Sequence, residues 1–214
     1  MAKKIPLTHL GFVVLFGAVW GLSETALGVA IEKCASFASG SIMTGIAFFF
    51  IAATWILSRN ILGLFLLVSI ASLFKMFDAL LLSLPLQNGA VANPIFAFWM
   101  ETLAFFVLAT IVDVEASKKK TLKQALLGGM SALLAANFFP LVKYVTGIPA
   151  CVFPGTNYPL ALYFLPLAVC VSFLSVPCGL WVGEKVRDLE VKIEILSPAT
   201  LILSLAIIAL IRLG

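Results

Sequence analysis

The sequence predicts an all-α fold, a polytopic bundle of six to seven transmembrane helices that forms one domain over residues 1–214. Of the 214 residues, 62% are hydrophobic and 11% are charged, and the mean hydropathy is +1.14. A water-soluble domain with this composition would expose large apolar patches. The apolar runs are about 20 residues long, enough for a helix to cross a hydrocarbon core roughly 30 Å thick. They also lack the strict alternation of a membrane barrel.

Seven apolar segments follow one another along the chain, and we expect helices over 10–31, 40–58, 61–84, 95–113, 124–147, 159–183 and 196–212. The first follows Lys3 and Lys4 as a signal peptide would, but the run is too long and no small-residue cleavage site follows it. The third is interrupted by Lys75 and Asp78 and ended by Pro85, so it can stop early and continue as a short interfacial helix. Pro140 predicts a kink in the fifth.

The basic residues predict a cytoplasmic N-terminus, because that orientation places most of them on the inner side of the membrane. They are Lys3, Lys4, Arg59, Lys118, Lys119, Lys120, Lys123, Lys185, Arg187 and Lys192. We therefore expect a multi-pass protein of the cytoplasmic membrane, in contact with the lipid bilayer. The net charge of +4 is a topology signal and indicates no nucleic-acid partner. Charged residues with apolar ones at helical spacing over 183–194 predict a short amphipathic helix.

Five ionisable residues lie within the predicted spans: Glu24, Lys75, Asp78, Glu101 and Lys143. A charge in hydrocarbon costs several kcal/mol unless it is paired or faces a wet cavity. At about 1.5 Å of rise per residue, all five fall in the outer half of the membrane. A cavity open to the outside would collect charges in one layer in this way. The alternative is that these residues form ion pairs that only hold helices together.

Aromatic residues accompany both glutamates. Trp20 lies one helical turn before Glu24, and Phe98 and Trp99 adjoin Glu101. An aromatic ring beside a carboxylate suits a flat heterocycle that carries hydrogen-bond donors or a partial positive charge. Loops 86–93 and 148–158 contain Pro and Gly and could cover such a pocket. The candidate substrate-binding residues are Trp20, Glu24, Lys75, Asp78, Trp99, Glu101, Asn137 and Lys143.

Small residues repeat at four-residue spacing in the first span, at Gly17 and Gly21 and again at Ala26 and Ala30. Such faces allow close helix approach, either within the protein or to a membrane partner. We expect these four residues to form a helix interface of one of these two kinds.

Several signatures of catalysis are missing. The one histidine, His9, lies at the start of the first span, so no His-rich metal cage and no Ser/His protease dyad can form in the outer half. No Walker A sequence occurs, so ATP hydrolysis would have to come from another chain. We predict no metal site, no cofactor and no enzymatic activity. Whether Cys34 and Cys151, both in predicted outer loops, form a disulfide stays open.

Two stretches carry a family resemblance: Gly17-Ala-Val-Trp-Gly-Leu-Ser-Glu-Thr-Ala-Leu-Gly28, and the region from Leu73-Phe-Lys-Met-Phe-Asp78 through Trp99-Met-Glu-Thr102. With the chain length and the absence of an ATPase motif, they resemble the substrate-binding (S) subunits of energy-coupling factor vitamin transporters. The resemblance implies capture of a vitamin or its precursor from outside. It also implies docking, through small residues of the first helix, onto a transmembrane coupling subunit driven by two ATPases.

Carried onto this chain, the resemblance assigns the coupling face to Ala26 and Ala30, or to Gly17 and Gly21, and the pocket to Glu24, Lys75 and Glu101. The family usually has six helices, so a seventh span would be an addition or a miscount of the third. Two other interpretations stay open at this stage. One is an ion- or proton-coupled secondary transporter with Glu24 and Glu101 as carriers, and the other is a structural membrane subunit.

Overall fold

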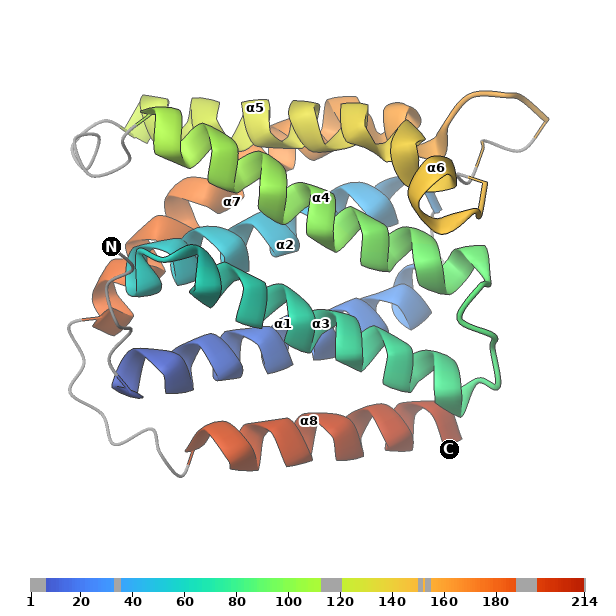
Figure 1. Ribbon diagram of the computed structural model, residues 1–214, viewed down its shortest axis with the longest axis horizontal. Helices are drawn as coiled ribbons and strands as arrows, with labels where there is room; N and C mark the ends of the chain where they lie inside the picture. Colours follow the sequence, from blue (N-terminus) through green and yellow to red (C-terminus); the bar gives the residue numbers. More distant parts are fainter. Residues whose placement is uncertain are drawn as a thin grey trace.

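The computed structural model describes residues 7–32, 36–112, 121–149, 152, 155–187 and 196–213, and these residues form a bundle of helices. The long helices run side by side along one direction (Figure 1). The elements are α1 (Leu7–Glu32), α2 (Ser36–Ser58), α3 (Ile61–Leu81), α4 (Gly89–Val112), α5 (Thr121–Phe138), a 3₁₀ turn η1 (Phe139–Leu141), α6 (Val142–Thr146), α7 (Leu160–Arg187) and α8 (Leu196–Leu213). The predicted all-α membrane bundle is confirmed.

Six helical segments in the described part of the chain are long and apolar enough to cross a membrane: His9–Ala26, Ser39–Ser58, Ile61–Leu81, Gly89–Val112, Thr121–Thr146 and Leu160–Arg187. The chain is a multi-pass membrane protein. The seventh predicted span forms a helix, α8, whose apolar part, Pro198–Ile211, is shorter than the other six. The lower of the two predicted counts therefore fits the long spans, and α8 is an additional apolar helix.

Several boundaries differ from the predicted ones. The third span ends at Leu81, because Ser83 takes a positive φ of 54° that stops the helix. The fourth begins at Gly89, six residues before its predicted start, and includes Pro94 near its N-terminus. Residues 89–93 are thus helical and belong to no lid. Of the predicted amphipathic segment, 183–187 continues α7, and 188–195 lies outside the described residues.

The fifth span breaks where the sequence predicts a kink. Pro140 lacks the backbone N–H that an α-helix needs, and the chain passes from α5 through η1 into the short α6. Gly147 ends α6 in the left-handed conformation, with φ 72°, and its N–H donates to the Lys143 carbonyl. In Figure 1, α6 turns away from the direction of α5 at one end of the bundle.

The bundle is built around α2 and α7, which share the most extensive contact, and α5 also packs on α7. Glycines allow this close approach, because an added β-carbon at Gly179 would collide with the Phe49 carbonyl oxygen and one at Gly128 with the Ser172 carbonyl oxygen. On the far side of the bundle, α8 packs along α1 and α3 (Figure 1). The core runs through the centre and includes the fully buried Trp20, Phe48 and Phe105.

Candidate functional site

A cavity of about 370 Å³ lies toward one end of the bundle. Its walls come from the second halves of α1, α3 and α5 and the first halves of α2, α4 and α7. Three charged side chains of the described residues line it: Glu24 from α1, Lys75 from α3 and Glu101 from α4. Antiparallel neighbours bring these residues, distant in sequence, to the same level of the bundle. The volume falls within the range of roughly 300–1,000 Å³ that is typical of small-molecule sites.

Glu24 is held by Trp20, one turn earlier on α1. The indole Nε1–H donates a hydrogen bond of 3.2 Å to Glu24 Oε1, and Glu24 is only 5% exposed. Trp20 itself is fully buried behind Glu24 and packs on Phe98, with ring centroids 5.1 Å apart. Trp20 therefore orients the carboxylate and does not line the cavity, whereas Phe98 does. The predicted Trp20–Glu24 pair acts as one unit, with Glu24 at the cavity wall.

Lys75 lies between two carboxylates. Its Nζ is 3.4 Å from Asp78 Oδ2, one turn later on α3, and it is close enough to Glu24 for an electrostatic interaction. Asp78 is almost fully buried and does not line the cavity. Asp78 thus anchors the lysine from behind, and part of the structural ion-pair alternative applies to this pair. Lys75 still presents its side chain to the cavity.

Glu101 is the second carboxylate of the cavity and is 6% exposed. The Thr44 side chain of α2 lies near it in the cavity wall, and Glu24 lies close enough for the two carboxylates to repel each other. Among the described residues, Glu101 forms no salt bridge. A buried carboxylate beside a second one is costly unless a positive group compensates it, and Lys75 forms its salt bridge with Asp78.

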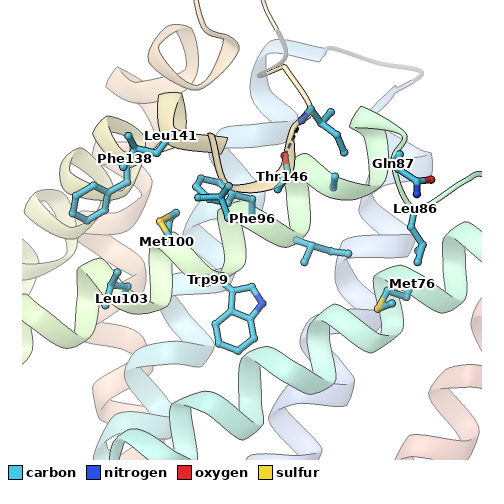
Figure 2. Close-up of a pocket in the computed structure, with 14 residues that line it drawn as sticks. Met76, Leu86, Gln87, Phe96, Trp99, Met100, Leu103, Phe138, Leu141 and Thr146 are labelled. Carbon is cyan, nitrogen blue, oxygen red and sulfur yellow. Dashed lines mark hydrogen bonds between the residues drawn. The ribbon is translucent and has the colours of Figure 1, made fainter. Parts of the chain in front are cut away.

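Trp99 does not belong to this cavity. An α-helix turns about 100° per residue, so residues 99 and 101 point roughly 200° apart, whereas Phe98 lies three residues before Glu101 on nearly the same face. Trp99 instead packs on Phe65 of α3, with centroids 5.5 Å apart. Figure 2 shows its indole in a separate groove between α3 and α4. The prediction that Trp99 lines the site was wrong, because it relied on the closeness of Trp99 to Glu101 in the sequence.

The groove at Trp99 is larger, about 720 Å³, and almost wholly apolar. Met76, Phe96, Met100 and Leu103 contribute to it, and Gln87 and Thr146 are its polar members at one end (Figure 2). None of the charged candidates lines it. We place the candidate site in the smaller cavity, because only that cavity joins charged groups from several helices.

Asn137 and Lys143 also lie away from the cavity. The Asn137 side chain is exposed and donates from Nδ2 to the Leu133 carbonyl, 2.8 Å away on its own helix. Lys143 is exposed on α6, beyond the break at Pro140. The predicted depth of Lys143 assumed one continuous helix, and the change of direction at η1 removes this residue from the charged layer. The layer at the cavity therefore consists of Glu24, Lys75, Asp78 and Glu101.

The four small residues of α1 predicted to form an interface differ in their surroundings. An added β-carbon at Gly17 would lie 2.9 Å from Ile70 Cβ, and one at Gly21 would lie 2.5 Å from Phe74 Cβ, both on α3. These two glycines therefore pack within the chain and are not free to meet a partner subunit. Ala26 is half-buried, and the side chain of Ala30 lies outside the described residues. Of the predicted partner face, only Ala26 and Ala30 are left.

Several cavity residues were missed by the sequence reasoning. Thr44, Asn93 and Phe164 line the cavity, and Ser41 beside them donates a 3.1 Å hydrogen bond from α2 to the Phe164 carbonyl of α7. A polar signal for α2 was available, since Ser39, Ser41 and Thr44 recur in an otherwise apolar segment. Three small residues of α5, Ala132, Ala135 and Ala136, also line the cavity and leave room for it.

Comparisons with models of protein families, with curated proteins and with solved structures gave no significant match. Within the residues that the structure describes, no group of three or more His, Cys, Asp or Glu residues could hold a metal ion. The cavity itself therefore carries the functional argument. It combines two carboxylates, one ammonium and three phenylalanines, Phe98, Phe139 and Phe164, in walls that are otherwise mostly apolar.

Proposed function

We propose that this protein is a substrate-binding subunit in the cytoplasmic membrane that takes up a small aromatic or heterocyclic nutrient, such as a vitamin or its precursor, from the outer side. The observation that carries the proposal is the cavity in which Glu24, Lys75 and Glu101 meet from three helices. Carboxylates beside aromatic rings bind flat molecules with hydrogen-bond donors. The volume of about 370 Å³ suits a molecule of one to two rings.

The partners proposed are those implied by the resemblance to energy-coupling factor transporters: a transmembrane coupling subunit and ATPases. Two features of the chain support this arrangement. It has no Walker A sequence of its own. Ala26 and Ala30 are the predicted small residues of α1 that remain for a partner once Gly17 and Gly21 are packed on α3. Co-expression with candidate coupling subunits, comparing wild type with Ala26→Leu, tests the docking face.

Ligand capture is tested with the full-length protein purified in mild detergent. The protein is denatured and any released small molecule is identified by mass spectrometry. We expect a molecule in the wild type that is lost from the double variant Glu24→Gln/Glu101→Gln. The matched control is Glu184→Gln, which removes a carboxylate near the other end of α7. Absence of any bound molecule, together with no thermal stabilisation by candidate nutrients, contradicts the proposal.

The proximity of Glu24 and Glu101 supports one other function, an ion- or proton-coupled secondary transporter. Neighbouring carboxylates inside a membrane protein are a common arrangement for carrying protons or ions. Solute flux into vesicles without ATP, abolished by Glu24→Gln, would favour this second function. Flux only in the presence of ATPase partners would favour the first.

A further inference from the structure

We propose that the ligand of this cavity is an organic cation whose positive group lies between Glu24 and Glu101. This inference rests on the proposed function and assigns the charge of the substrate. It starts from the charges around the cavity. Among the residues that the structure describes there, Glu24, Asp78 and Glu101 supply three carboxylates, and Lys75 supplies one ammonium. With these groups ionised, the described residues of this part of the bundle carry more negative than positive charge, and Glu24 and Glu101 form no salt bridge among them.

Each carboxylate has a distinct neighbourhood. Asp78 has Lys75 at 3.4 Å, and Glu24 has the Trp20 N–H at 3.2 Å with Lys75 farther off. The main side chains that act on Glu101 are Thr44 and the repelling Glu24. Both glutamates are more than nine-tenths buried and line the cavity. A positive group between them would give Glu101 its missing counter-charge and relieve the repulsion.

The shape of the cavity favours an organic cation over a bare metal ion. A volume of about 370 Å³ is far larger than an ion needs, and the described residues offer no metal-binding group. Phe98, Phe139 and Phe164 provide ring faces for an aromatic body, and ring faces also attract cations. Carboxylates at the charged end and phenylalanines in the walls together fit a flat molecule that carries a positive charge.

The far end of the cavity has the opposite character. Gly89 and Ala90, at the start of α4, line it, and the positive end of the helix dipole lies there. The Asn88 side chain already caps this end by accepting from the Ala90 N–H at 2.9 Å. Ala90 and Glu101 are separated by about 16 Å along the helix. The cation therefore belongs at the Glu24–Glu101 end, away from the start of α4.

The test compares three probes of nearly equal shape, benzamidinium, benzamide and benzoate, binding to the full-length protein by calorimetry in detergent. We expect the order benzamidinium, benzamide, benzoate from tightest to weakest. Because a charged hydrogen bond is lost, Glu101→Gln and Glu24→Gln should each weaken benzamidinium about tenfold or more while changing benzamide little. Glutamine reproduces a protonated glutamate, so unchanged benzamidinium binding would show that the carboxyl groups carry protons instead, and would overturn the inference.

A variant that should increase the affinity for benzamidinium distinguishes a specific effect from damage to the fold. Lys75→Met removes the competing ammonium and should tighten benzamidinium severalfold, which a merely disrupted cavity cannot do. The double variant Lys75→Met/Asp78→Asn removes one charge of each sign and should bind nearly as the wild type. Lys123→Met, at the exposed start of α5, is the remote control and should change nothing.

The failure of the inference is distinguishable from the failure of the proposed function. Equal or tighter binding of benzamide or benzoate overturns the cation while leaving a binding protein. If none of the three probes binds, the inference is overturned as well, and a co-purifying neutral or anionic molecule then leaves the proposed function standing. If no probe binds and no small molecule co-purifies, both proposals are contradicted.

Discussion

Replacing Gly45 by alanine perturbs the most extensive helix contact of the bundle, that between α2 and α7. A β-carbon at residue 45 would overlap Val171 Cγ1 and lie 3.2 Å from Val171 Cβ. Non-bonded carbons prefer about 3.5–4.0 Å. Valine is stiff at χ1, so the methyl group cannot rotate away freely. The two helices must therefore separate, or the valine must be strained.

The expected cost follows from two opposing effects. Overpacking a well-packed interface costs about 1–3 kcal/mol. Alanine is the better helix former, which returns about 0.5–1 kcal/mol relative to glycine. We expect Gly45→Ala to lower the free energy of unfolding by about 0.5–2 kcal/mol. A titration with sodium dodecyl sulfate in mixed micelles, followed by circular dichroism, measures this change.

Trimming the colliding side chain should reverse part of the loss. Val171→Ala removes Cγ1, and the closest approach to residue 45 then becomes the 3.2 Å between two β-carbons. In the Gly45→Ala background we expect it to recover about 1 kcal/mol, an interaction typical of residues in contact. Leu174→Ala, at an exposed position of α7, should recover nothing. Additive losses in the Gly45→Ala/Val171→Ala variant would refute the close packing of α2 on α7 at this point.

Three further predictions concern α1, the site and α6. Gly21→Ala should destabilise by about 1–3 kcal/mol. Phe74→Ala should rescue it only in part, because it removes Cγ and Cδ1 but leaves the 2.5 Å clash with the Phe74 β-carbon; full recovery in unfolding titrations would contradict this packing. Trp20→Phe keeps an aromatic ring but removes the N–H that holds Glu24, so ligand affinity should fall about tenfold, and unchanged calorimetric binding would deny Trp20 its orienting role. Lys143→Ala, at an exposed position, should leave ligand binding within about twofold of wild type, and a large loss would return Lys143 to the site.

Much of the fold could be predicted because it depends on properties that are local in the sequence. A run of about 20 apolar residues must be helical in hydrocarbon, since no water is there to satisfy its backbone. The Trp20–Glu24 contact likewise follows from the helical period, because residues four apart share a face. Trp99 shows the limit of such reasoning. It was predicted to lie beside Glu101 because the two are close in the sequence, but its side chain lies on the opposite side of the same helix.

Other features depended on how helices meet. Gly17 and Gly21 have the same four-residue spacing as Ala26 and Ala30, yet the two glycines pack against Ile70 and Phe74 of α3. A small residue allows another helix to come close, but the sequence does not show which helix that is. Lys143 does not lie with the other charged residues, because the chain changes direction at the break after Phe138. The predicted depth was counted along one straight helix and did not include this change.

The sequence by itself determined that this protein is a helical membrane protein and that charged residues lie at similar depths in its spans. Hydrophobicity and helical rise are properties of the chain, so they can be read from it directly. Only the tertiary structure decided that Glu24, Lys75 and Glu101 share a cavity, that Asp78 holds the lysine from behind, and that Phe98 rather than Trp99 faces them. Those relations depend on the rotation of each helix about its axis, which packing between side chains of different helices sets.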